Sequence, residues 1–152
     1  MNVTIEYLNK TTIKNNNIVI FLSKLSELRS LNLHFNLQNL QNNKDFVNRI
    51  KEQKYIEFTT QSLKNQNLLK IKIYLINTKE KNPIYLGASI FDQCNFKIEK
   101  NISFIFSNFL IQKKINICTD IIFGFKLKSY RFDKYLTNKK NLNENIKIFL
   151  IS

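Results

Sequence analysis

Short apolar runs rich in β-branched residues alternate along this chain with segments of helical period, and this alternation limits the fold most strongly. Continuous apolar runs are typical of strands in a sheet that is covered on both faces. Helices placed between such strands indicate an α/β layer fold. We expect strands at residues 3–8, 18–22, 55–60, 68–76, 102–106 and 143–152, and helices at 37–51, from Pro83 onward, and from about 116 to 136.

Length and composition predict a single domain over residues 1–152. A chain of 152 residues can bury most of its apolar surface, and a hydrophobic fraction of 43% is ordinary for a globular protein. The N-terminus has no apolar segment of the signal-peptide type, and the most apolar run, 102–111, is shorter than the ~20 residues that span a bilayer. We therefore expect a cytoplasmic protein without a membrane partner.

The positive charge of the chain has two possible explanations. A net charge of +13 is typical of proteins that bind nucleic acid or anionic membranes. Only three of the 24 basic residues are arginine, however, namely Arg29, Arg49 and Arg131. Arginine is preferred for bidentate contacts to phosphate and guanine. The excess of lysine over arginine therefore suggests that the positive charge reflects the codon usage of an AT-rich genome. A nucleic-acid-binding module remains an alternative.

The residues that usually carry chemistry are scarce. The chain has two glycines and lacks the phosphate-binding and nucleophile motifs, and His34 is its only histidine. Cys94 and Cys118 stand alone, as buried free thiols do in a reducing compartment. The carboxylates show no paired spacing. We predict no catalytic residue, no metal site and no cofactor in this chain.

The segment 121–136 is best placed on an amphipathic helix. Gly124 beside its apolar stripe suggests that another backbone comes close at that point. On such a helix Tyr130 and Tyr135 can bury their rings while they keep their hydroxyl groups near water or a partner. A packed surface helix is favoured, and a membrane-surface helix and a nucleic-acid contact are the alternatives. The stripe comprises Ile117, Ile121, Phe125, Phe132 and Leu136.

The same segment resembles a known family. Its sequence "YRFDKY", together with the preceding glycine, is similar to the end of the N-terminal domain of the leucyl aminopeptidases, and "LLKIKIYLI", "YLGASIF" and "NIKIFLIS" resemble neighbouring elements of that domain. The resemblance implies a macro-domain-like three-layer α/β/α sandwich with a mixed central sheet. The residues that match the family motif are Gly124, Tyr130, Arg131, Phe132, Asp133, Lys134 and Tyr135.

The resemblance also implies that catalysis takes place in a different domain. The parent enzymes release N-terminal residues from peptides with two divalent metals, zinc or manganese, held in a C-terminal domain. The catalytic motif of that domain does not occur here, since Asn77-Thr78 is followed by Lys79-Glu80. We therefore expect an isolated or truncated, catalytically silent N-terminal domain whose partners are the catalytic domain and sister subunits of a hexamer. A stand-alone macro-like ligand-binding domain is a further alternative.

Overall fold

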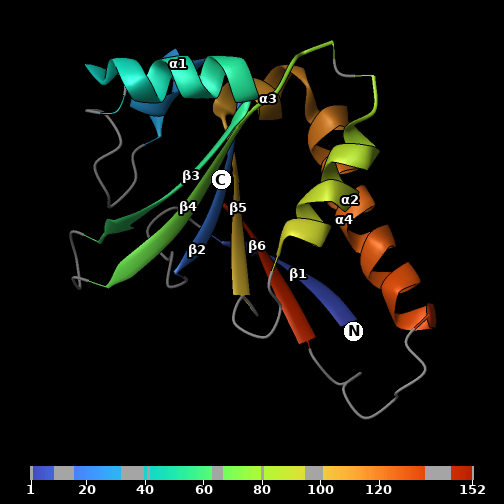
Figure 1. The fold of residues 1–152 in the computed structure, drawn as a ribbon. Coiled ribbons are helices and arrows are strands. Elements are labelled where there is room, and N and C mark those ends of the chain that lie inside the picture. The colour runs from blue at the N-terminus through green and yellow to red at the C-terminus, as the bar shows by residue number, and fades with distance from the viewer. Residues whose placement is uncertain are drawn as a thin grey trace.

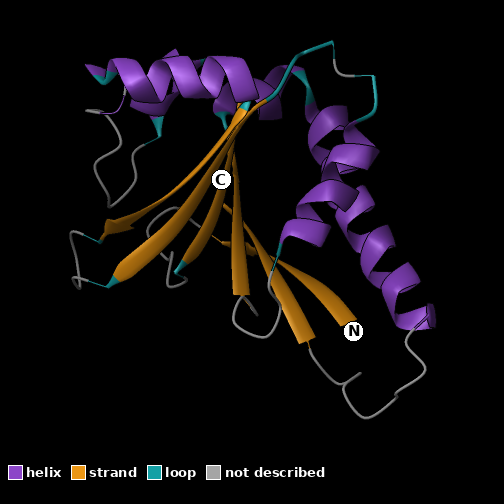
Figure 2. Ribbon diagram, viewed as in Figure 1, coloured by secondary structure: helices purple, strands orange, loops and turns teal. Residues whose placement is uncertain are grey.

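The computed structural model is a mixed α/β protein built on one six-stranded sheet (Figures 1 and 2). It describes residues 2–8, 16–31, 40, 42–62, 67–79, 81–94, 101–135 and 145–151. The strands are β1 (Asn2–Leu8), β2 (Asn17–Leu22), β3 (Tyr55–Gln61), β4 (Leu68–Leu75), β5 (Asn101–Phe106) and β6 (Asn145–Ile151). The helices are η2 (Leu25–Ser30, a 3-10 helix), α1 (Lys44–Gln53), α2 (Pro83–Gln93), α3 (Asn108–Lys113) and α4 (Ile115–Tyr135).

The strands lie in the order β1-β6-β5-β2-β4-β3. Five of them run parallel, and β3 runs antiparallel to its neighbour β4. The expected succession of strands and long helices is confirmed, and β3 and β4, which are consecutive in the chain, pair antiparallel. The strands β1 and β3 form the two edges of the sheet.

Alternate residues of β2 point into two separate apolar clusters. Val19 and Phe21 pack with residues of α2, α3 and α4 on one face, whereas Ile18, Ile20 and Leu22 pack with η2 and α1 on the other. Because both faces are covered, the central strands β2 and β5 are mostly apolar, as the sequence indicated. Figure 1 shows α2 and α4 crossing beside one face of the sheet and α1 lying across its upper end.

The helix starts follow from asparagine and serine caps. The side chain of Asn43 accepts hydrogen bonds from the backbone N–H groups of Asp45 and Phe46, so α1 begins at Lys44. The expected start at residue 37 is wrong as far as the described residues reach, because residues 40 and 42 are 3-10 in character. Asn82 caps α2 in the same way, which confirms the predicted start at Pro83.

Two short helices were not predicted. The helix α3 directly follows β5 and is capped by the buried Ser107, whose hydroxyl accepts from the backbone N–H of Leu110 at 3.3 Å. The apolar run of β5 continues into this stretch, so hydrophobic pattern alone does not separate the strand from the helix. Ser107 is the only sequence signal that a helix begins here. The helix η2 similarly follows β2 and buries Leu28.

Candidate functional site

The glycine of the family-like motif lies where two helices touch. A Cβ atom added to Gly124 would sit 2.7 Å from the carbonyl carbon of Ile84, and one added to Gly87 would sit 2.8 Å from the backbone nitrogen of Phe125. Ordinary contact begins at 3.4 Å, so α2 and α4 cross too closely for any side chain at either position. The expectation of a close backbone approach at Gly124 is confirmed.

The rest of the motif follows on the last turns of α4. Tyr130 is 68% exposed, so its ring is not buried against the rest of the protein. Ile121 and Phe125 are fully buried, as the predicted stripe requires. Residues 131–135 continue the helix, but the side chains of Arg131, Phe132, Asp133, Lys134 and Tyr135 lie outside the described part of the structure, as does Leu136.

A hollow lies at the carboxyl ends of the parallel strands. Its walls come from Ser23 and Lys24 after β2, Asn77 and Thr78 after β4, and Phe109 after β5. The chain leaves β2 toward the face covered by η2 and α1, and leaves β4 and β5 toward the other face. The hollow therefore sits where the direction of connection reverses, which is the usual ligand position in open α/β sheets.

Lys54 reaches the same hollow because of its backbone. It ends α1 in the left-handed conformation, with φ at 59°, and its carbonyl accepts the backbone N–H of Leu75 at 2.9 Å. Lysine is uncommon in this conformation, where glycine or asparagine usually stands. Lys24 and Lys54 give the hollow positive charge, while Glu27 beside it accepts hydrogen bonds from the backbone N–H and the hydroxyl of Ser23.

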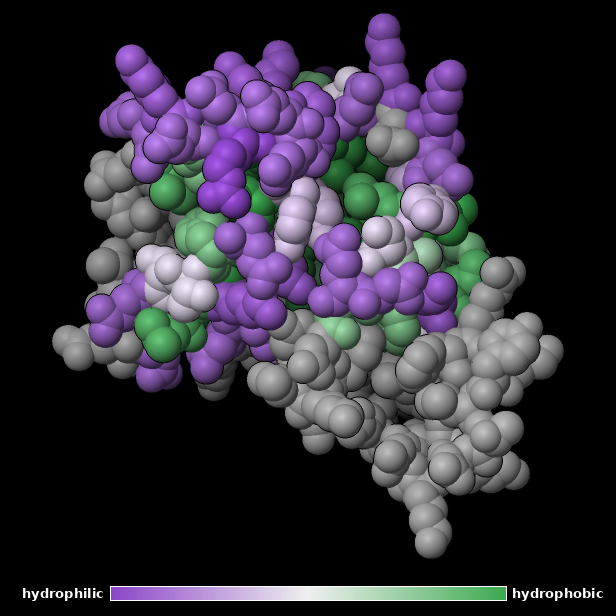
Figure 3. Space-filling view, viewed as in Figure 1, coloured by the Kyte–Doolittle hydropathy of each residue, from purple (hydrophilic) through white to green (hydrophobic). Residues whose placement is uncertain are grey.

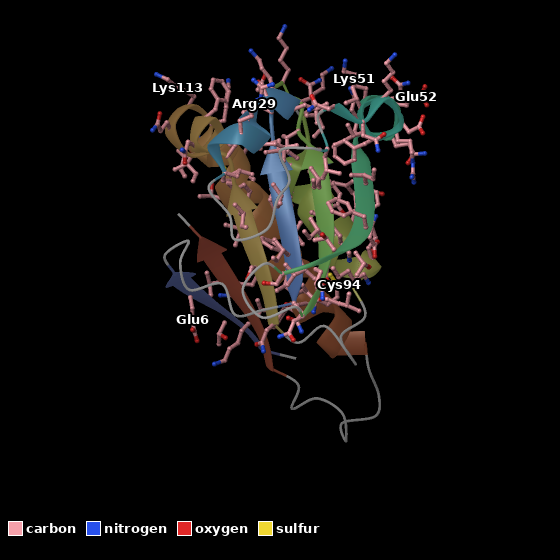
Figure 4. The ribbon with its side chains drawn as sticks, turned by 90° about the vertical axis from the view of Figure 1, so that its left-hand side faces the viewer. Glu6, Arg29, Lys51, Glu52, Cys94 and Lys113 are labelled. Atoms are coloured by element: carbon pink, nitrogen blue, oxygen red, sulfur yellow. The ribbon has the colours of Figure 1, made fainter. Side chains whose placement is uncertain are left out.

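This end of the molecule is generally basic. Figure 4 shows Arg29, Lys51 and Lys113 at the carboxyl ends of the strands, with Glu52 among them, and Cys94 toward the opposite end. The arrangement can attract an anionic ligand. Sequence reasoning missed the hollow, although its signal was present as polar pairs directly after two apolar strands, Ser23-Lys24 and Asn77-Thr78.

A second polar cluster lies on β3 and β4. The hydroxyl of Tyr55 donates to Glu57 at 2.6 Å, and Lys70 forms an ion pair with the same carboxylate at 3.2 Å. The ring of Tyr55 lies 4.7 Å from that of Tyr74, whose hydroxyl donates to Gln93 of α2 at 2.6 Å. These bonds fix one end of α2 to the sheet.

The charges within this cluster shift its pKa values in opposite directions. Burial raises the pKa of Glu57, but hydrogen bonds from Tyr55 and Lys70 and the positive charge of Lys72 outweigh it and hold the pKa below its usual value. Burial is also the largest cause of the raised pKa of Tyr74. Lys72 is only 4% exposed and is the cross-strand partner of Glu57, so the two side chains lie on the same face of the sheet. The cluster therefore keeps Glu57 ionised and the tyrosines neutral.

The described residues offer few groups for metal or thiol chemistry. They contain no group of three or more His, Cys, Asp or Glu side chains that could hold a metal ion, and His34 lies outside them. Cys118 is buried and burial raises its pKa to about 11, whereas Cys94 is only half-buried, so the expectation of a buried thiol is confirmed for Cys118 alone. Across the same residues, no helix is long and apolar enough to cross a membrane.

Comparisons with known proteins add no family to this description. No protein-family model matches the chain, and no curated protein sequence is significantly similar to it.

Proposed function

We propose that this chain is the non-catalytic N-terminal domain of a leucyl aminopeptidase, with a macro-domain-like three-layer α/β/α sandwich. The observation that carries the proposal is the motif itself. Its residues Gly124 and 130–135 lie on α4, and Gly124 is the point at which α4 meets α2. Helices against both faces of a mixed sheet support the fold.

In this role the domain supports assembly and controls access to an active site elsewhere. Two divalent metals in the catalytic domain polarise the peptide carbonyl and activate water. The present chain contributes no ligand to them, and its partners are that domain and sister subunits. Its own surface sets how subunits approach one another.

A chimera tests the proposal. The chain replaces the N-terminal domain of a leucyl aminopeptidase, and light scattering and hydrolysis of leucine p-nitroanilide report assembly and activity. We expect a hexamer with activity, and no turnover by the chain alone with Zn²⁺ or Mn²⁺. The matched control carries Gly124→Leu, which blocks the helix crossing. A chimera that assembles no better than one with an unrelated domain, or turnover by the chain alone, would contradict the proposal.

The hollow favours a second candidate, a stand-alone macro-like domain that binds a ligand of the ADP-ribose type. Its two lysines suit phosphate groups and the half-exposed ring of Phe109 suits a base. Calorimetric titration with ADP-ribose tests this function, with the double variant Lys24→Gln and Lys54→Gln as control. The absence of heat at millimolar ADP-ribose removes this candidate and leaves the first untouched.

A further inference from the structure

The residue that joins α1 to β3 is a lysine in a costly backbone conformation. Lys54 is the single residue between Gln53, the last of α1, and Tyr55, the first of β3. Its φ of 59° lies in the left-handed region, and within the described part of the chain no other residue has a positive φ. A Cβ atom makes this conformation unfavourable, which is why glycine usually fills such a position.

Two backbone hydrogen bonds fix Lys54 in this conformation. Its N–H donates to the carbonyl of Ile50 at 2.9 Å, and its carbonyl accepts the N–H of Leu75 at 2.9 Å. These bonds tie the end of α1 to the end of β4, so any residue at this position must be left-handed. Asparagine tolerates the conformation better and is abundant in this chain. Strain that persists beside a pocket suggests that the side chain has a function there.

Stability at the end of α1 is a weak explanation for this lysine. A cation at a helix C-terminus interacts favourably with the helix dipole, but Lys51 in the last turn of α1 already supplies one. The side chain of Lys54 is exposed, and among the described residues it forms no ion pair. It does line the hollow at the carboxyl ends of the strands.

The groups that share the hollow with Lys54 are mainly hydrogen-bond donors. The side-chain oxygen of Asn77 accepts the backbone N–H of Lys79 at 3.0 Å, which leaves its NH₂ group to donate to a ligand. Thr78 adds a hydroxyl group, and Lys24 adds a second ammonium group. A set of this kind suits an anion with several oxygen atoms.

The size and the charge of the hollow suit a small anionic molecule. Its volume is about 400 Å³, which is in the range of small-molecule pockets. None of its described lining residues is acidic, and the carboxylate of Glu27 beside it is held by the backbone N–H and the hydroxyl of Ser23. Phe109, which is 40% exposed, forms an aromatic wall. Figure 3 shows hydrophilic side chains, in purple, gathered over α1 at this end of the molecule.

We propose that the hollow binds a small phosphate monoester and that Lys54 selects its phosphate group. Two ammonium groups match the roughly two negative charges that a monoester carries at pH 7, and the amide and hydroxyl donors match its remaining oxygens. A carboxylate has one charge and two oxygens, so it leaves part of this set unpaired. A ring on the ester would stack on Phe109. The inference deepens the ligand-binding role given above as the second candidate, on whose hollow it rests.

The probe is phenyl phosphate, titrated into the ¹⁵N-labelled full chain and followed by NMR. We expect the amide signals of Ser23, Lys24, Asn77 and Thr78 to move most, because these residues line the hollow. Benzoate keeps the ring but has a single charge, and it should bind about tenfold more weakly.

Variants at position 54 separate recognition from stability. Lys54→Gly should weaken phenyl phosphate about tenfold, since one charge-assisted hydrogen bond is lost. It should not lower the urea midpoint, because glycine relieves the left-handed strain. Lys54→Arg keeps the charge and should retain most of the affinity. The control Lys44→Gln removes an exposed lysine at the other end of α1 and should leave the affinity unchanged.

Equal affinity for phenyl phosphate and benzoate, or unchanged affinity in Lys54→Gly, would overturn the proposal. A lower urea midpoint in Lys54→Gly would show that the lysine is kept for stability, and signals that move equally over all exposed lysines would show non-specific binding. The ADP-ribose titration is read separately. Binding of phenyl phosphate without binding of ADP-ribose removes the second candidate alone, whereas ADP-ribose binding that is unaffected by Lys54→Gly removes this inference alone.

Discussion

Replacing Gly124 by alanine gives the sharpest test of the packing between α2 and α4. In an ordinary helix interior, the change from glycine to alanine stabilises by about 1 kcal/mol. Here the new methyl group would sit 2.7 Å from the carbonyl carbon of Ile84, where ordinary contact begins at 3.4 Å. The atom it meets is backbone, so the clash cannot be relieved by rotating a side chain.

The carbonyl oxygen of Ile84 lies closer still, so the helices must move apart by clearly more than the roughly 0.7 Å between those two distances. Phe91 and Phe125, whose rings meet edge to face at 5.2 Å across this interface, then lose contact. Overpacking of this kind costs about 1–3 kcal/mol, and a clash with backbone falls at the upper end. After the gain in helix propensity, we expect a net loss of about 2 kcal/mol in the free energy of unfolding.

Urea unfolding followed by circular dichroism measures the loss, and Lys126→Ala provides the control. Lysine and alanine have similar helix propensity and position 126 is exposed, so the control should change stability by less than about 0.5 kcal/mol. Gly87→Ala should resemble Gly124→Ala, because its methyl group would lie 2.8 Å from the carbonyl carbon of Ile121. A Gly124→Ala protein as stable as the wild type would refute the reasoning.

Further predictions concern charge and thiols. The lowered pKa of Glu57 contributes stability that is present above its unfolded value of 4.5 and is lost as the pH falls through its folded value. In the Glu57→Gln variant, the free energy of unfolding in urea should therefore fall less steeply below about pH 4.5. The difference should be less than about 1 kcal/mol, because the ion pair of Glu57 with Lys70 is partly exposed. Native iodoacetamide labelling should modify Cys94 and spare Cys118, whose pKa of about 11 leaves roughly 100-fold less thiolate than a pKa of 9; mass spectrometry showing Cys118 labelled first would contradict this. DNA binding in gel-shift assays should be weak, independent of sequence and abolished by moderate salt; a sequence preference would instead favour the nucleic-acid-binding module.

Much of the fold could be predicted because the amino-acid composition of the strands reflects how deeply they are buried. The runs at β2 and β5 are largely apolar because both faces of the sheet are covered, and no turn chemistry interrupts them. Pro83 marked the start of α2 because its fixed backbone suits the first turn. Local signals of this kind can be read without knowing which helix or strand packs against the segment.

The predictions fell short where tertiary contacts determine which side chains are exposed and which residues come together. The sequence left the burial of Tyr130 open, because the side of α4 that faces the sheet is set by the crossing at Gly124. In the structure this crossing leaves Tyr130 exposed. Lysine is rarely buried in folded proteins, yet Lys72 of β4 is only 4% exposed. The hollow was missed because three separate strand ends form it, and only the strand order brings them together.

The antiparallel edge strand β3 has a consequence for the solubility of the protein. One side of β3 pairs with β4, and within the described residues its other side is an edge of the sheet, the kind of edge on which a second chain can add a strand. Its exposed residues Glu57, Thr59 and Gln61 are polar, but Glu57 alone carries charge. Protonation of that carboxyl group at acid pH removes its negative charge and with it the ion pair to Lys70 beside this edge. We therefore expect β-rich aggregation, detected by thioflavin T, to begin at acid pH from this strand.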